Sequence, residues 1–253
     1  MVLDNTDVGA RTTTLQRAIP VLLCSVCSLC SVVPALAQVV VNLDLGVGGF
    51  VSIPGASEPC GDVLLNADGR VEAGYAWQGE GVQEPYYGAF AECYSGEAAV
   101  CAVFFDFSQV SESQSGQTMD VFVWDDANGE PGAILAVVSD VDPGPIASWP
   151  DFSRHSVTVP ELPCTESAWW VGYWGDWPGE SYGWAIGADL DGPGGCPLTN
   201  IAPGIGLPSG WQNVSVVWGP TTALDIGAEV LECSPTPIVT SSWGRVRALY
   251  SRD

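Results

Sequence analysis

Short runs in which side chains alternate between two faces constrain the fold of this chain more than any other feature. In HSVTV, the residues His155, Val157 and Val159 fall on one face, and IGAEV at residues 226–230 repeats the pattern. Clusters of Gly, Pro, Asp and Asn separate such runs, as in the stretch DANGEPG. A period of two bounded by turn residues is typical of half-buried β-strands.

The alternating runs recur through residues 60–233, and no window there has the period of an amphipathic helix. About ten short strands separated by turns fit one antiparallel β-sandwich of jelly-roll-like topology, so we predict an all-β domain stapled by disulfides. Three runs carry specific expectations. CAVFFDF should turn Cys101, Val103, Phe105 and Phe107 to one face, MDVFVWD should oppose Met119, Val121 and Val123 to Asp120, Phe122 and Trp124, and WQNVSVVW at 211–218 should form a strand.

The two ends of the chain differ from this domain. Residues 1–37 combine two arginines, a short apolar run and small residues at Ala35 and Ala37, which predicts a secretory signal peptide. Residues 38–59 are either a first strand or an apolar arm able to pair with another chain. Residues 234–253 form a Pro/Ser/Thr linker followed by a basic, aromatic tail, which is either a frayed terminus or an address.

The net charge of the chain limits the classes of partner that it is expected to bind. It has 30 acidic residues against seven basic ones, no lysine, and a net charge of −23, and loss of residues 1–37 removes two charges of each sign. This surface argues against nucleic acid and against anionic lipid, since both require Lys and Arg. No later apolar segment reaches the length of a membrane span. A soluble, secreted, extracellular or cell-surface protein is expected.

Six cysteines remain after residue 37, and an even number in a secreted chain predicts disulfides. Six cysteines allow 15 pairings. We expect Cys93–Cys101 to clip a hairpin, Cys164–Cys196 to bracket the aromatic region, and Cys60–Cys233 to join the two ends of the domain. Zinc is not expected, because this part of the chain has no CxxC pair and a single histidine, His155.

One hairpin carries a resemblance. The stretch QTMDVFVWDDANGEPGAILA, residues 117–136, resembles a strand–turn–strand unit of secreted bacterial β-sandwich modules, jelly-roll-like accessory or surface domains. The tail WGRVRALYSRD is similar to short terminal tags of exported bacterial proteins. Such modules bind or present and do not catalyse, so the resemblance implies a non-catalytic binding domain.

Aromatic residues are the best candidates for binding. The block AWWVGYWGDWPGESYGW, residues 168–184, reads as two strands joined by a turn, with the first strand apolar on both faces. Most of its rings are expected in the core, while Gly172 should leave room for a ring or a ligand. Rings that bind sugar are expected near the turn and near the PYYG motif. The predicted ligand-binding residues are Trp177, Trp174, Tyr182, Tyr86 and Tyr87.

Acidic turns could hold a structural calcium ion, because Ca²⁺ takes six to eight oxygen ligands from flexible loops. The candidates are Asp189 and Asp191 in one turn and Asp125, Asp126 and Asn128 in another. The competing interpretation is that Asp, Asn and Gly form these turns without a metal. No cofactor is expected to be required.

No catalytic residue is predicted. A serine hydrolase would have to use His155, which shares a face with two valines, and the chain lacks a strand–turn–helix nucleophile motif. The leading hypothesis is therefore a non-enzymatic module that binds carbohydrate or another extracellular polymer. One alternative is a surface or filament subunit that self-assembles through residues 38–59 or the tail. A second is a glycan-active hydrolase with a carboxylate pair drawn from Glu80, Glu84, Glu92 and Asp106.

Overall fold

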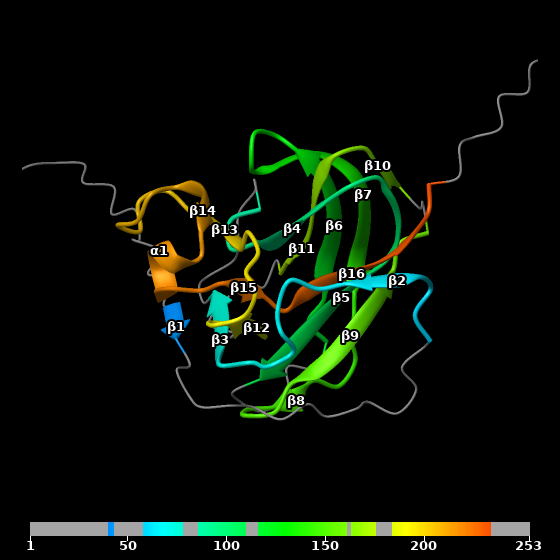
Figure 1. Cartoon of the computed structure of the whole chain (residues 1–253). Coiled ribbons are helices and arrows are strands. Elements are labelled where there is room, and N and C mark those ends of the chain that lie inside the picture. The colour runs from blue at the N-terminus through cyan, green and yellow to red at the C-terminus, as the bar shows by residue number, and fades with distance from the viewer. Residues whose placement is uncertain are drawn as a thin grey trace, which may run out of the picture. The chain divides into compact units, whose positions relative to one another are not determined.

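The computed structural model describes residues 40–42, 58–77, 86–109, 116–160, 163–175 and 184–233 (Figure 1). The predicted signal peptide, the tail and the residues Trp177 and Tyr182 lie outside this part of the chain. In the described residues, no helix is both long and apolar enough to cross a membrane.

The strands form two sheets. The larger sheet has the order β1-β3-β12-β5-β16-β2, and β8, β9, β10 and β15 pair onto its strands. All its pairs are antiparallel except that of β5 with β8. Its strands are β1 (Val40–Asn42), β2 (Asp62–Leu64), β3 (Ala73–Trp77), β5 (Ala98–Gln109), β8 (Ala147–Ser148), β9 (Ser153–Thr158), β10 (Cys164–Thr165), β12 (Ala185–Asp189), β15 (Ala223–Leu224) and β16 (Ile226–Leu231).

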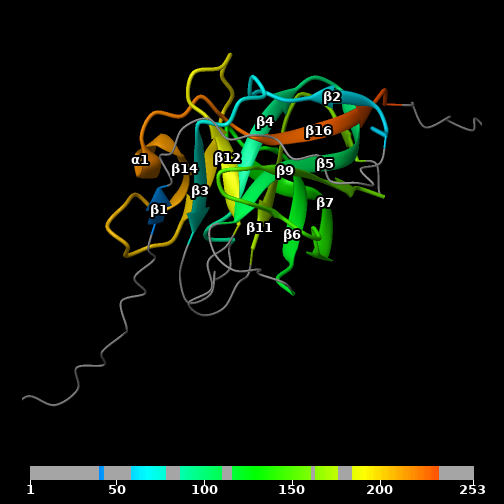
Figure 2. The same ribbon diagram turned by 90° about the horizontal axis from the view of Figure 1, so that it is seen from below.

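The smaller sheet has the order β14-β13-β4-β11-β6-β7. Its strands are β4 (Phe90–Ser95), β6 (Met119–Asp126), β7 (Pro131–Val141), β11 (Ala168–Trp174), β13 (Leu198–Ile201) and β14 (Gly210–Asn213). Viewed from below, β6, β7 and β11 lie on one side and β16 and β2 on the other (Figure 2). The main core lies between the sheets, with Phe105 and Ile226 from one sheet and Trp169 and Tyr173 from the other.

The predicted all-β sandwich is therefore correct, although the described residues contain sixteen strands where about ten were expected. Several of the additional strands have only two residues. The hairpin of β6 and β7 has the predicted strand–turn–strand form. Strand β9 alternates between buried and exposed residues as predicted, and it buries His155. Val40–Asn42 pair with β3 of the same chain, and the rest of residues 38–57 lies outside the described residues.

Two local predictions were wrong. Residues 211–218 do not form one strand, because β14 ends at Asn213 and a single helical turn, α1 (Ser215–Trp218), follows. That turn places Trp218 against Tyr75 and Phe90 in the core. Cys101 does not share the inward face of β5, because the register with β16 shifts there and leaves it opposite no residue of β16. A bulge of this kind reverses the side-chain phase of the strand.

All six predicted cysteines form disulfides, but each predicted pairing was wrong. The bonds are Cys60–Cys101, Cys93–Cys196 and Cys164–Cys233. Cys93 and Cys101 cannot clip a hairpin because the short turn between them carries the chain from one sheet to the other. Spacing along the chain suggested a hairpin, and the sheet crossing is a property of the tertiary fold. The three bonds indicate an oxidising, extracellular setting.

The described part of the aromatic block contains one strand, β11, and the next strand, β12, begins directly after the block at Ala185; the two strands belong to opposite sheets. Gly172 in β11 does not leave room for a ligand, as the sequence suggested. A Cβ atom added there would lie 2.1 Å from the carbonyl oxygen of Phe90 in β4. Glycine is needed at this position because two backbones approach closely, and not because a ring or sugar occupies the space.

Gly172→Ala is therefore expected to lower the free energy of unfolding by about 1–3 kcal/mol, since the backbone of β4 must move to admit the methyl group. Gly74→Ala is the matched control, because its nearest new neighbour would be 3.3 Å away, the Cβ atom of Ala185. Chemical denaturation of both variants measures the difference. Equal stability of the two variants would show that the strands do not approach so closely.

Candidate functional site

The outer face of the smaller sheet carries a layer of aromatic rings. Phe122, Trp124, Trp170 and Trp174 point away from the main core and form a second apolar cluster, with exposed fractions of 2–8 %. Phe122 stacks on Trp124 with ring centroids 4.9 Å apart. Trp211 from β14 meets Trp124 edge-on at 5.8 Å and is partly exposed. The strands β6 and β11 are therefore apolar on both faces, as the sequence indicated for β11.

The structure brings three of the five predicted binding residues together on this layer. Tyr86 contacts Trp174 at 5.3 Å and Phe122 at 5.0 Å, both edge-on. The indole Nε1 of Trp174 donates to the carbonyl oxygen of Tyr87 at 3.1 Å. Tyr86 and Tyr87 are half-buried, and Tyr86 adopts a positive φ of 64° in the turn before β4. The Tyr86 ring thus forms part of the solvent side of the layer.

Sequence reasoning did not assign Phe122, Trp124 or Trp211 to a site. A signal for two of them was present, since Phe122 and Trp124 alternate with the inward-facing Val121 and Val123. A strand with apolar residues on both faces requires a cover on its second face, or a ligand. Trp211 had no such signal, because its contact with Trp124 joins strands at distant positions in the sheet.

The predicted acidic turns differ in what their side chains do. Asp189 is fully buried and its carboxylate accepts the backbone N–H groups of Asp68, Asp191 and Gly192. A carboxylate oxygen of Glu72 comes within 4.8 Å of those of Asp189 and Asp191. Burial raises the pKa of Glu72, and the nearby charges of Asp189 and Asp191 raise it further, against the hydrogen bond from Leu190.

The acids of the other turn support its backbone. Asp126 accepts the N–H of Gly129 at 3.1 Å and the indole Nε1 of Trp170 at 2.9 Å. Asp125 accepts the N–H of Ala133. Asn128 adopts a φ of 63°, which a turn residue of this type tolerates. In the described residues, these acids belong to neither of the two clusters with three possible metal ligands.

Glu92 is a fully buried carboxyl group that joins the two sheets. Its Oε1 accepts hydrogen bonds from the side-chain amide of Asn66 at 2.9 Å and from the N–H of Cys196 at 2.6 Å. Its Oε2 accepts the N–H of Leu224 at 2.9 Å. Burial raises the pKa of Glu92 to about 7, although these hydrogen bonds favour the charged form.

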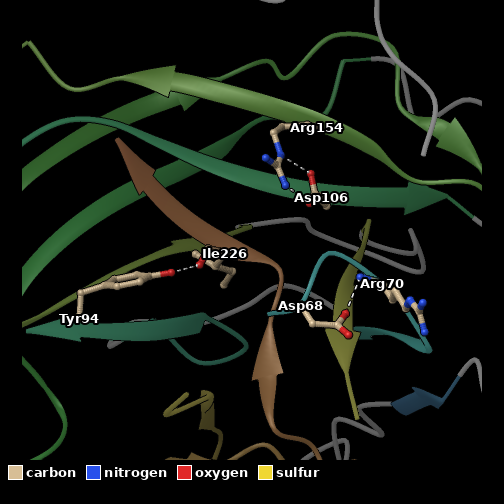
Figure 3. Close-up of polar contacts among 6 residues, drawn as sticks. All are labelled: Asp68, Arg70, Tyr94, Asp106, Arg154 and Ile226. Carbon is tan, nitrogen blue, oxygen red and sulfur yellow. Dashed lines mark hydrogen bonds and ion pairs between the residues drawn. The ribbon is translucent and has the colours of Figure 1, made fainter. Parts of the chain in front are cut away.

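Glu92 and Asp106 do not form the carboxylate pair that a hydrolase would need. Glu92 points between the sheets, whereas Asp106 lies on the outer face of the larger sheet. Both carboxylate oxygens of Asp106 accept hydrogen bonds from the guanidinium group of Arg154, at 2.9 and 2.7 Å (Figure 3). Glu80 and Glu84, the other acids considered, lie outside the described residues.

His155 forms a buried polar chain that the sequence did not reveal. Its Nδ1 lies 2.7 Å from the carbonyl oxygen of Pro143, and its Nε2 lies 2.8 Å from the hydroxyl of Ser153. A carbonyl can only accept, so Nδ1 carries the proton and Nε2 accepts from Ser153 in the neutral ring. Burial lowers the pKa of His155 and favours this neutral form. Ser153 also accepts the N–H of Ala147, so both side chains are held within the fold.

Comparisons with protein-family models, with curated proteins and with solved structures gave no match to this chain.

The buried carboxyl of Glu92 predicts a pH dependence of stability. Its folded pKa of about 7 exceeds the ordinary value of 4.5, so its contribution is fully present below about pH 4.5 and is lost as the pH rises through 7. A rise of this size corresponds to about 3 kcal/mol. The difference in unfolding free energy between the wild type and Glu92→Gln should therefore fall by about 3 kcal/mol from pH 4 to pH 8.

Urea denaturation across this pH range measures the difference. The exposed substitution Glu166→Gln controls for the loss of one acidic group. If the difference in unfolding free energy between the wild type and Glu92→Gln stays constant or grows with pH, then the three hydrogen-bond donors, and not burial, determine the pKa of Glu92.

Proposed function

We propose that this protein is a secreted, non-catalytic module that binds a neutral extracellular polysaccharide through the aromatic layer on the smaller sheet. The observation that carries the proposal is the arrangement of Tyr86 and Trp211, two partly exposed rings, over the buried rings of that layer. Rings held by other rings lose little conformational freedom on binding, and sugar C–H faces stack on such surfaces.

Several observations support this assignment. The indole N–H groups of Trp170 and Trp174 are engaged by Asp126 and by the backbone of Tyr87, so the ring orientations are set before any ligand arrives. Trp177 follows Trp174 by three residues in the sequence and lies outside the described residues, so its part in binding stays a prediction. The signal sequence expected in residues 1–37 and the three disulfides agree with export.

The charge of the chain favours a neutral polymer. The net charge is −23 and no lysine is present, so a polymer bearing carboxylate or sulfate groups would meet long-range repulsion. A neutral glucan or chitin-like chain carries no such penalty. Binding to a neutral polymer is also expected to depend weakly on salt, because the polymer carries no charges whose interaction with the protein salt could screen.

Tyr86→Ala and Trp211→Ala are expected to weaken retention on cellulose or chitin about tenfold or more, because each removes an exposed ring from the surface. Trp177→Ala tests the adjoining segment in the same way. Depletion isotherms of the full chain on the insoluble polymers, with alginate as an anionic comparison, provide the measurement.

Trp149→Ala is the matched control, since Trp149 is also a partly buried tryptophan but packs against Ala76 and Ala185 of the larger sheet. Each variant is checked for an unchanged melting profile. Retention that is equal in the wild type and in both ring variants would reject the aromatic layer as the binding surface.

Self-association is a second candidate function, favoured by one specific observation. Strand β7 is an edge of the smaller sheet and exposes three large apolar side chains, Ile134 at 44 %, Leu135 at 37 % and Val137 at 40 %. Ile134 lies beside Trp124 and Val137 beside Phe122, so the exposed patch continues the aromatic layer. Register shifts along β6 and β7 disfavour direct edge pairing, which leaves face-to-face contact of two copies.

If this candidate is correct, the wild type sediments as a dimer or larger species at tens of micromolar concentration, and the double variant Ile134→Thr/Val137→Thr sediments as a monomer. Val63→Thr is the control, because Val63 is similarly exposed (49 %) on β2, an edge strand of the other sheet. Added salt should strengthen the association by screening the negative charge. A monomeric wild type at all salt concentrations rejects self-association.

A further inference from the structure

We propose that Glu72, Asp189 and Asp191 form a calcium site on the larger sheet. Carboxylate oxygens of these three residues all lie within 4.8 Å of one another. Oxygen ligands that each lie 2.3–2.6 Å from a Ca²⁺ ion are at most about 5 Å apart, so one ion can contact all three. The residues come from three places, the chain just before β3, the end of β12 and the turn that follows it.

The hydrogen bonds leave ligand oxygens available. Oε2 of Glu72 accepts the N–H of Leu190 at 3.1 Å, and among the described residues no contact of its second oxygen would keep that oxygen from a metal ion. Within the described part of the chain, Oδ2 of Asp189 accepts only the N–H of Asp68, at 2.7 Å, and keeps a lone pair. The N–H groups that donate to Asp189 therefore orient its carboxylate and still leave Oδ2 able to bind a metal ion.

A second observation comes from Asp225, which is fully buried and whose two carboxylate oxygens have no hydrogen-bond partner in the described part of the chain. Its Oδ2 would lie 2.6 Å from a Cβ atom on Gly187, so the carboxylate sits on the same face of β12 as Asp189, two residues away. The charges of Asp106, Asp189 and Glu72 act on Asp225, and the charge of Arg154 opposes them. A buried carboxyl without a donor, next to a carboxylate cluster, is stable in its charged form only if a cation lies nearby.

Among the described residues, Arg154 acts electrostatically on Asp225, but no hydrogen bond joins the two side chains. Arg154 is committed to Asp106 by two hydrogen bonds, and this is the ion pair found among the described residues. Asp68 accepts the backbone N–H of Arg70 at 2.8 Å, and the guanidinium of Arg70 extends away from that carboxylate (Figure 3). The chain has no lysine. An all-oxygen site with flexible loop ligands fits Ca²⁺ better than Zn²⁺, which prefers nitrogen and sulfur, or Mg²⁺, which requires a near-ideal octahedron.

Isothermal titration of the full, oxidised, EDTA-treated chain with CaCl₂ tests the site, with melting temperatures recorded in Ca²⁺ and in EDTA. We expect one Ca²⁺ per chain and a higher melting temperature in Ca²⁺. Asp191→Asn, at an exposed position, and Glu72→Gln should each weaken binding at least tenfold. Glu166→Gln, an exposed acid elsewhere, should bind as the wild type does.

Absence of both a binding heat and a melting shift in the wild type would overturn the proposal. So would binding that survives Asp191→Asn and Glu72→Gln unchanged, or that is lost only in Asp125→Asn, which would place the ion at the β6–β7 turn. Equal affinity for MgCl₂ would overturn the assignment to calcium. Because this site is on the sheet opposite the aromatic layer, its failure would leave the polysaccharide proposal standing.

Discussion

The buried carboxyl of Glu92 is the interaction on which the joining of the two sheets depends. It accepts hydrogen bonds from Asn66, Cys196 and Leu224, which are distant from one another in the chain, and Leu224 belongs to a strand of the opposite sheet. Two residues later on β4, the hydroxyl of Tyr94 donates to the carbonyl oxygen of Ile226 at 2.7 Å (Figure 3). These two side chains tie β4 to β15 and to β16 through hydrogen bonds whose loss would leave buried polar groups unpaired.

That arrangement constrains its surroundings. A Cβ atom on residue 195 would lie 2.2 Å from Oε1 of Glu92, so a glycine at this position is needed to leave room for the Glu92 carboxylate. The next residue, Cys196, both donates to Glu92 and forms the disulfide to Cys93. The covalent link therefore lies next to the polar link, and both hold β4 against the segment that leads into β13.

The two outer faces of the sandwich have opposite chemistry. The smaller sheet presents rings that are apolar and already oriented, whereas the larger sheet carries carboxyl groups at Glu72, Asp189, Asp225 and Asp106 with one guanidinium among them. An apolar face suits a neutral polymer or a second copy of the chain, and an acidic face suits a cation. Under the two proposals, one domain would bind through one sheet and be stabilised through the other.

Much of this could be predicted from local patterns. The alternation in MDVFVWD separates Val121 and Val123 from Phe122 and Trp124 correctly, and HSVTV places His155 inward. Turn residues locate the β6–β7 hairpin. These properties are local, so the sequence determined them without reference to the rest of the fold.

Only the tertiary structure decided which strands share a sheet. The disulfide partners of Cys93 and Cys101, the contact of Trp211 with Trp124, and the meeting of Glu72 with Asp189 all join residues far apart in the chain. Gly172 shows the same limit, because its role depends on how closely β4 approaches and not on its neighbours in sequence. The side-chain period of a strand predicts which face each residue lies on. Which residues pack against that face depends on how the strands are ordered and packed.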